Sequence, residues 1–360
     1  MHNSVATNQT LIDSNMVEGK ANKRVSSIDV ARLAGVSQAA VSRTFTPRGS
    51  VSDKTRQKVL AAAKKLGYTP NVIARSLIQQ STKIIGIVMV RFQNPFYANV
   101  LGEITRKLNE LGYRTLLINV AHSKEVDEAL PKALQYQADG IIITSATLSS
   151  KMADGCARAQ TPVVLFNRYD SSGNFNAIYC DSVGGGRLVA DALLDAGHQR
   201  LAFIAGEKDT STSRDREKGF TEGIRARGDK LFLRENGDYT YEAGYSAAER
   251  LLKRKKRPDA IFCANDLIAM GALDYARGQL GIQVPQELSI VGFDDIPMAG
   301  WPGYSLTTIR QPVDWMVDAT IERLMRAIKA PGAETVMKKV HGILVERDSA
   351  RTGKLEKEAV

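Results

Sequence analysis

The residues that could do the most specific chemistry lie near position 40, in a predicted helix over residues 38–45. The face opposite the apolar side of that helix carries short polar groups and one arginine: Gln38, Ala39, Ser42 and Arg43. An amide can pair with adenine, and a guanidinium can meet guanine or a phosphate. Such a face suits insertion into the DNA major groove, and the alternative is a three-helix bundle with an ordinary polar surface.

Three short helices must hold that face in place. Ser26, Ser37 and Ser52 stand where each helix should be capped, and Gly35 ends the first helix. The tight joint at Gly35, Val36 and Ser37 between the first two helices is typical of a helix-turn-helix. The apolar residues of the first helix that we expect in the core are Val30, Ala31 and Leu33.

Positive charge is concentrated in the same part of the chain. The 360 residues carry a net charge of +10, and residues 1–82 hold 12 basic and 4 acidic side chains. The remaining 278 residues therefore carry only +2. This asymmetry favours a polyanionic partner for the first quarter of the chain, and the alternative is a solvated basic tail.

Beyond residue 83 the pattern changes to short apolar runs separated by amphipathic helical stretches. The runs are IIGIVMV (84–90), TLLINV (115–120), GIIIT (140–144), PVVLF (162–166), AIYC (177–180), LAFIAG (201–206), AIFCAN (260–265) and LSIVGF (288–293). Apolar strands that alternate with helices indicate parallel sheets covered on both faces. Eight strands over about 250 residues fit two doubly wound lobes better than one sheet. The expected fold class is therefore α/β, with an all-α N-terminal domain.

Composition and motif searches exclude several classes of protein. The chain shows no apolar run of membrane-spanning length and no secretory signal at its N-terminus, and its three cysteines fit a reducing compartment. We therefore expect a cytoplasmic, nucleoid-associated protein with no membrane partner. The four histidines are scattered without metal-ligand spacing, and Gly184-Gly185-Gly186 is neither a dinucleotide-binding nor a phosphate-loop motif. We expect no metal, no cofactor and no enzyme activity.

A series of motifs in order resembles the lactose-repressor (LacI/GalR) family of transcription regulators. The motifs are DVARLAGVSQAAVSR (29–43), VSDKTRQKVLAAAKKLGYTPNVIARSL (51–77), NPFY (94–97), ANDLIAMGAL (264–273), IVGFDD (290–295) and SLTTIRQP (305–312). The resemblance covers about residues 26–352 and implies a helix-turn-helix, a hinge helix and two lobes like those of periplasmic binding proteins.

The resemblance gives the expected division of the chain. We expect a disordered tail at 1–25, a helix-turn-helix domain at 26–70, a hinge helix and linker at 71–82, a two-lobed effector-binding and dimerisation domain at 83–352, and a tail at 353–360. Lobe 1 is expected at about 83–180 and 310–337, and lobe 2 at about 181–308 and 338–352.

The resemblance also assigns residues to DNA. The positions that match the recognition helix and its end are Ser37, Gln38, Ala39, Ser42, Arg43 and Thr46. Thr46 stands where many family members carry asparagine, so its contact is open. Leu77 matches the hinge leucine that wedges into the minor groove, where two such residues from a dimer would bend the duplex.

Matching positions for an effector lie at the ends of predicted strands, where open α/β sheets bind ligands. They are Phe96, Asn167, Asp181, Arg216, Tyr239, Asn265 and Asp294. An arginine, two carboxylates, amides and aromatic rings suit a polyhydroxylated ligand, and they would also serve a purine or nucleoside.

Together these features predict a homodimeric, effector-responsive repressor of a carbohydrate uptake or catabolism operon. Its partners would be a pseudo-palindromic operator and a small molecule in the cleft between the lobes. The short C-terminal tail has no leucine heptads, which favours a dimer over a coiled-coil tetramer. The alternatives are a soluble sugar-binding component of a transport system and, third, a nucleotide-using α/β enzyme.

Overall fold

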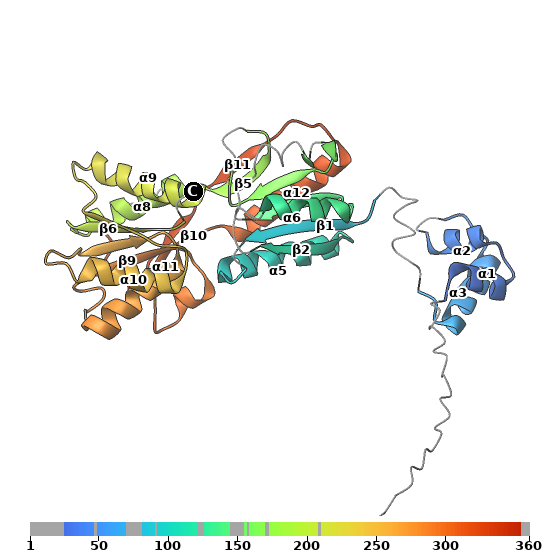
Figure 1. The fold of residues 1–360 in the computed structure, drawn as a ribbon, viewed down its shortest axis with the longest axis horizontal. Helices are drawn as coiled ribbons and strands as arrows, with labels where there is room; N and C mark the ends of the chain where they lie inside the picture. Colours follow the sequence, from blue (N-terminus) through green and yellow to red (C-terminus); the bar gives the residue numbers. More distant parts are fainter. Residues whose placement is uncertain are drawn as a thin grey trace, which may run out of the picture. The chain divides into compact units, whose positions relative to one another are not determined.

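The computed structural model describes residues 25–46, 49–69, 81–90, 92–120, 126–144, 155–156, 158–169, 173–207 and 210–353. The chain divides into two compact units, Met1–Ile78 and Gln79–Val360 (Figure 1). The expected N-terminal tail, most of the hinge segment with Leu77, and most of the C-terminal tail lie outside the described residues. Among the described residues, no helix combines the length and the apolar character that crossing a bilayer requires.

The described part of the first unit is helical, with α1 (Ser27–Ala34), α2 (Gln38–Phe45) and α3 (Asp53–Leu66). A capping box begins α1: the Ser26 hydroxyl accepts from the Asp29 N–H, and the Asp29 carboxylate accepts from the Ser26 N–H at 3.0 Å. Ser37 and Ser52 cap the next two helices through their side chains, as the sequence predicted. These caps satisfy backbone donors that a helix of eight residues cannot satisfy internally.

Small side chains form the core of this unit and let its helices approach closely. The buried members are Val30, Ala31, Ala34, Val41, Val59, Ala62 and Ala63. The prediction for Leu33 was wrong, because its side chain is 46% exposed and Ala34 is buried instead. Ala34 lies one helical turn after Val30, so the buried stripe follows the i, i+4 spacing and leaves Leu33 at its edge.

The second unit holds two six-stranded sheets, each the centre of one lobe. The first sheet is entirely parallel in the order β11 (Met337–Val340), β5 (Asn176–Cys180), β4 (Val163–Phe166), β3 (Gly140–Thr144), β1 (Ile84–Val90) and β2 (Arg114–Val120). Its described helices are α5 (Pro95–Glu110), α6 (Val126–Gln135) and α12 (Val313–Lys329). Alternate residues of β1 point to opposite faces, so both faces of the sheet are apolar and covered.

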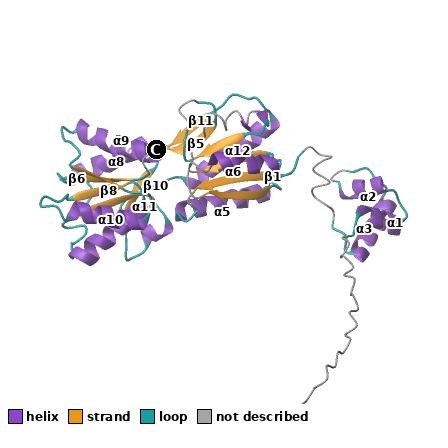
Figure 2. Ribbon diagram, viewed as in Figure 1, coloured by secondary structure: helices purple, strands orange, loops and turns teal. Residues whose placement is uncertain are grey.

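The second sheet has the order β12 (Ile343–Val345), β10 (Thr307–Arg310), β9 (Ser289–Asp294), β8 (Ala260–Cys263), β6 (Leu201–Ala205) and β7 (Leu233–Asn236). Only β12 runs antiparallel to its neighbour. Its helices are α8 (Ser182–Asp195), α9 (Ser211–Ala226), α10 (Tyr241–Leu252), α11 (Asp266–Asp274), a π-helical turn at Tyr275–Gln279 and a 3-10 turn at Pro297–Gly300. Figure 2 shows helices on both faces of this sheet.

The chain passes between the two lobes three times within a short distance. The passages follow β5, β10 and β11, at residues 181, 311–312 and 341–342. The last passage comes after Val340, slightly later than the expected change of lobe at 337. A Cβ on Gly342 would lie 3.0 Å from the Arg310 carbonyl oxygen and 3.4 Å from Cys180 Sγ, so the three passages pack against one another. Any change in the angle between the lobes must therefore be absorbed here.

The close contact between α8 and α9 in the second lobe depends on glycine. A Cβ on Gly219 would lie 1.9 Å from the Val183 carbonyl oxygen, and one on Gly186 would lie 2.3 Å from the Arg216 carbonyl oxygen. Backbone cannot retreat as a flexible side chain can, so these positions exclude any larger residue.

We predict that Gly219→Ala lowers the free energy of unfolding of the second unit by about 3 kcal/mol, the upper part of the usual overpacking range. Both tryptophans of the chain, Trp301 and Trp315, lie in this unit and report its urea unfolding by fluorescence. The control is Gly102→Ala, where a Cβ meets nothing within 4 Å. Equal midpoints for the two variants would contradict this account of the α8–α9 contact.

Candidate functional site

The exposed face of α2 carries the side chains that the sequence assigned to DNA. Ser37, Gln38, Ala39, Ser42 and Arg43 are all exposed, while Ala40, Val41 and Thr44 of the same helix are buried. The separation follows the 3.6-residue period, which leaves one polar stripe free for a partner. This is the local geometry that a recognition helix needs.

Besides Ser37, which caps α2, two more of the residues assigned to DNA already have partners within the first unit. Gln38 Nε2 donates to the Ser27 hydroxyl at 3.0 Å, which joins the first turns of α1 and α2. Thr46 follows the last turn of α2, where its hydroxyl donates to the Ser42 carbonyl oxygen at 2.9 Å. To pair with a base, Gln38 must release or share its hydrogen bond with Ser27. The hydrogen bond of Thr46 to the last turn of α2 shows that Thr46 helps to end the helix.

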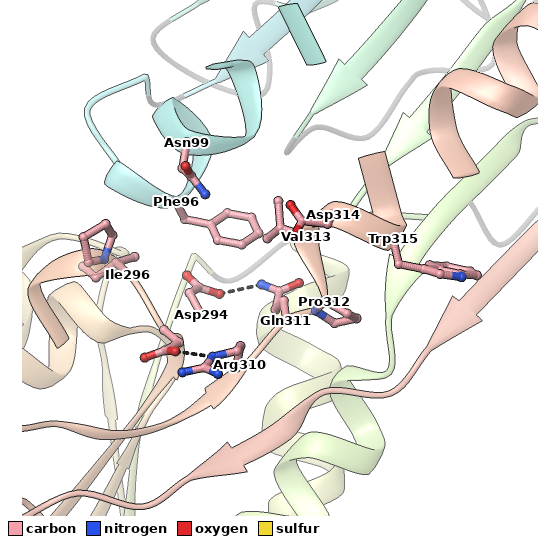
Figure 3. Close-up of a pocket in the computed structure, with 12 residues that line it drawn as sticks. Phe96, Asn99, Asp294, Ile296, Arg310, Gln311, Pro312, Val313, Asp314 and Trp315 are labelled. Atoms are coloured by element: carbon pink, nitrogen blue, oxygen red, sulfur yellow. Dashed lines mark hydrogen bonds and ion pairs between the residues drawn. The ribbon is translucent and has the colours of Figure 1, made fainter. Parts of the chain in front are cut away.

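A cavity of about 430 Å³ lies between the lobes of the second unit (Figure 3). It is bordered by Phe96 in the first turn of α5, by Asp294 at the end of β9 and by Gln311 in the second passage. The ring of Phe96 points toward Val313 of α12, and Asp294 of the second lobe faces Gln311. Phe96 and Asp294, two of the residues predicted for the effector, thus border one cavity.

A buried polar network joins the second lobe to the second passage. Arg216 Nη2 lies 3.1 Å from Asp294 Oδ1, and the same oxygen accepts from Gln311 Nε2 at 2.7 Å. Arg216 also donates to the Ala264 carbonyl oxygen and stacks on the Phe293 ring at 3.6 Å. Burial works to lower the pKa of Arg216, but the Asp294 charge, together with smaller contributions from Tyr239, Cys180 and Tyr97, outweighs burial and raises the pKa, so the guanidinium stays charged. Arg216 is thus a structural residue as well as a ligand candidate.

Tyr239 and Asn265 lie together in the second lobe, where their polar groups already form hydrogen bonds within the protein. The Tyr239 hydroxyl lies 2.9 Å from the Thr212 hydroxyl, and its ring covers Gly206 so closely that a Cβ there would be 2.2 Å away. Asn265 Oδ1 caps α11, and its Nδ2 donates to the Tyr239 carbonyl oxygen at 3.4 Å. These contacts hold the two side chains inside the second lobe, and neither residue lines the cavity that Phe96 and Asp294 share.

Asp181 occupies the first passage and lines a different cavity, of about 380 Å³, with Tyr169, Tyr179 and Lys339. Its carboxylate accepts from the Gly184 N–H at 3.0 Å as the cap of α8 and lies 3.2 Å from Lys339 Nζ of β11. Burial works to raise the pKa of Asp181, yet these two partners outweigh it and lower the pKa. The structure therefore separates Asp181 from the cavity that Phe96 and Asp294 share.

Three residues of the inter-lobe region were missed by the sequence analysis. Gln311 borders the cavity, and Tyr97 and Arg168 are buried, with 7% and 5% of their surface exposed. Burial raises the pKa of the Tyr97 hydroxyl, and the charges of Arg168, Asp294 and Arg216 all act on it, so these groups from both lobes lie near one another. Gln311 and Tyr97 lie within the matched motifs SLTTIRQP and NPFY, which was the available signal.

Several buried polar atoms in this region have no hydrogen-bond partner among the described residues. They include Asn167 Oδ1, Arg168 Nε, Arg216 Nε and Gln311 Oε1. Asn167 follows β4 with a left-handed φ of 58°, which turns the chain at the carboxyl end of the strand. Buried groups are normally paired, so this set can bind a ligand that carries both donors and acceptors.

The protein is related to known regulators over almost its whole length. Residues 28–71 match the family model described as bacterial regulatory proteins, lacI family, and residues 190–350 match a periplasmic binding protein-like domain. The ribose operon repressor of Escherichia coli K12 is 33% identical over 326 residues, which cover 89% of this chain and 98% of that repressor. The chain belongs to the LacI family of bacterial regulatory proteins.

Other members of the LacI family give the same result. The transcriptional repressor PurR of Erwinia tasmaniensis is 32% identical over 335 residues, covering 90% of this chain and 96% of PurR. A crystal structure of the Lac repressor dimer bound to operator and the anti-inducer ONPF matches with a TM-score of 0.82 at 26% identity, covering 91% of this chain and 99% of that one. The chain is thus a DNA-binding transcription regulator from a family of regulators, and the interpretation as a transport component is set aside.

A second buried carboxylate lies beneath the site of this LacI-family protein. Asp266, fully buried, accepts from the Ile296 N–H at 2.8 Å and from the Thr308 hydroxyl at 2.5 Å. Burial, with the nearby Asp294 charge, raises the pKa of Asp266 to about 7. The folded protein therefore holds a proton on this group at pH values where the unfolded chain has lost it.

We predict that the second unit loses stability as pH rises from about 4 to about 7, by at most about 4 kcal/mol from this group. The sign follows because the raised pKa in the folded state favours folding only while Asp266 is protonated. Asp266→Asn should flatten the pH dependence of urea unfolding across this window, and the exposed control Asp229→Asn should not. The same pH slope in Asp266→Asn and the native protein would show that Asp266 does not cause it.

Proposed function

We propose that the protein represses a carbohydrate uptake or catabolism operon, acting at the chromosome in the cytoplasm, and that a ligand between its lobes controls its affinity for the operator. The observation that carries the proposal is the set of buried polar atoms without partners at the lobe junction, in a chain of the LacI family. Leaving such atoms unpaired destabilises the protein without ligand, and a ligand that forms hydrogen bonds with them removes this penalty.

The chemistry of the cavity supports a polyhydroxylated ligand. Phe96 offers an apolar ring face, and Asp294 and Gln311 offer oxygen and amide groups from the other side. Stacking plus charge-assisted hydrogen bonds is how proteins hold sugars, and the same groups would serve a purine or nucleoside. The relative named as the ribose operon repressor supports the sugar class.

The ligand would act through the three passages between the lobes. Gln311 lies in one of them and bonds to Asp294, so a ligand on Asp294 reaches the connection directly. Ligand shifts the population of lobe arrangements only as far as its affinities for them differ. In this proposal the shift changes the order of the hinge segment that contains Leu77, and thereby the affinity for DNA.

Two heads of a dimer would bind a pseudo-palindromic operator. The exposed stripe with Gln38, Ala39, Ser42 and Arg43 would enter the major groove of each half-site, and Leu77 of each copy would wedge into the minor groove at the centre. Ser37 and Thr46 flank α2 at its two ends, and they would position the helix against the sugar-phosphate backbone of the DNA.

We predict that selection from a pool of randomised duplexes recovers a pseudo-palindrome with a flexible central step. Gln38→Ala should change the preferred base at one symmetric pair of positions and cost about 1–3 kcal/mol on the original site. The salt dependence of binding should stay the same, because the substitution removes a contact to a base and leaves the contacts to phosphates in place.

The control for this experiment is Ser27→Ala, which removes the hydroxyl that Gln38 bonds to in the free protein while leaving the amide. It should keep the original preference. Salt-sensitive binding with no enriched motif would reject the proposed operator recognition, and an unchanged preference in Gln38→Ala would reject the role of that residue.

We predict a dimer in solution, because the chain matches the structure of the Lac repressor dimer over 91% of its length. Light scattering after size exclusion should give twice the chain mass of 39.3 kDa at micromolar concentration. A mass four times that of the chain would contradict the prediction, and a monomer would require DNA-driven assembly of the heads.

A further inference from the structure

Arg168 is a buried cation without a counter-ion. It follows β4 at the junction of the lobes, with 5% of its surface exposed. Among the described residues, its guanidinium donates no hydrogen bond and lies within 4 Å of no carboxylate, and its Nε is buried without a partner. An arginine has five N–H donors and keeps its charge in proteins; here the Nε donor is buried without a partner, and the Nη donors make no hydrogen bond to the described residues.

The other buried arginine of the described chain shows the contrast. Arg216 has 2% of its surface exposed, and it is paired with Asp294, bonded to the Ala264 carbonyl oxygen and stacked on Phe293. The negative charge of Asp294 is thus already matched by Arg216 and by Gln311. Among the described residues, Arg168 therefore lacks the carboxylate partner that Arg216 has.

Arg168 belongs to the same site as Asp294 and Arg216. Arg168 follows β4 of the first lobe, whereas Arg216 and Asp294 belong to α9 and β9 of the second lobe. The charges of all three act on the pKa of the buried Tyr97 hydroxyl, so all three lie within electrostatic range of it. Asn167, the preceding residue, has its own buried acceptor without a partner. Arg168 and Asn167 therefore form a pair of incompletely satisfied polar side chains directly after β4, at the end of the first-lobe strand.

Burying an unpaired charge costs several kcal/mol in ordinary proteins, and buried charges are accordingly paired. A planar guanidinium is matched best by a carboxylate or phosphate, which accepts two parallel N–H bonds. A neutral sugar or purine could accept hydrogen bonds here but would leave the charge uncompensated.

We propose that the effector carries an oxyanion, a carboxylate or a phosphate, and that Arg168 binds it. The inference rests on the proposed function, since it gives the chemical class of the ligand that the inter-lobe site takes. The anionic group would lie at Arg168 on the first lobe, and the hydroxyl-bearing remainder would reach Asp294 and Gln311 on the second. The ligand would then tie the two lobes through opposite ends.

The test compares full-length native protein with Arg168→Gln by thermal unfolding followed through tryptophan fluorescence. The probes are inorganic phosphate, D-gluconate and D-ribose 5-phosphate, set against the neutral D-glucose, D-ribose and hypoxanthine. Anionic probes should raise the unfolding midpoint of the native protein, with affinities at least about tenfold weaker in Arg168→Gln. The matched control is Arg225→Gln, an exposed arginine of α9, which should behave as the native protein does.

The two anionic sugars separate the sources of the charge. Stabilisation by D-gluconate points to a sugar acid and stabilisation by D-ribose 5-phosphate to a sugar phosphate, and either supports the proposal. Stabilisation by neutral compounds alone, or an equal response to anions in Arg168→Gln and the native protein, would overturn it.

The unfolding temperatures of the two proteins without ligand test the proposal even when no probe binds. A guanidinium that awaits an anion destabilises the empty site, so Arg168→Gln should unfold at the same temperature as the native protein or higher. A lower midpoint would identify Arg168 as a structural residue and overturn the proposal. Operator selection with the native protein and with Arg168→Gln is a separate experiment that tests the proposed function. If neither protein enriches a motif, the proposed function is rejected. The unfolding temperatures then still test whether Arg168 binds an anion.

Discussion

The arrangement of the second unit depends on the ion pair between Arg216 and Asp294. It lies buried in the second lobe, and its two members come from α9 and from the end of β9. A buried pair stabilises a protein little against an apolar replacement, but losing one member leaves a costly isolated charge. The pair therefore acts as a constraint: each partner holds the other in place, and Gln311 attaches the passage between the lobes to it.

This constraint explains how one site could serve both binding and regulation. The three passages pack around Gly342, so the lobes cannot turn without moving Gln311 relative to Asp294. A ligand that bonds to Asp294, Gln311 and the first-lobe residues would favour one arrangement of these groups. In allosteric proteins the coupling free energy between two binding sites is typically about 1–3 kcal/mol. A difference of one or two hydrogen bonds to the ligand between the two lobe arrangements would supply it.

The sequence predicted the elements whose signal is strong and local. All eight apolar runs form strands, and most of them are central strands in which every residue or nearly every residue is buried, as continuous apolar runs predict. Four strands escaped notice: the edge strands β7, β11 and β12 are short and at most partly buried, and β10 is a short run with polar residues, Thr307–Arg310. Arg168 could not be found in this way, since an arginine after a strand is usually exposed and its burial depends on the packing of two lobes.

The central claim is that a ligand between the lobes and an operator at the heads bind to one coupled system. It is tested most directly by measuring a binding cycle: the affinity for selected operator with and without a stabilising ligand, and the affinity for that ligand with and without operator. Thermodynamic linkage predicts that the two ratios are equal and differ from one by about fivefold or more in one direction. Ligand affinity that does not change when operator is bound would contradict the account.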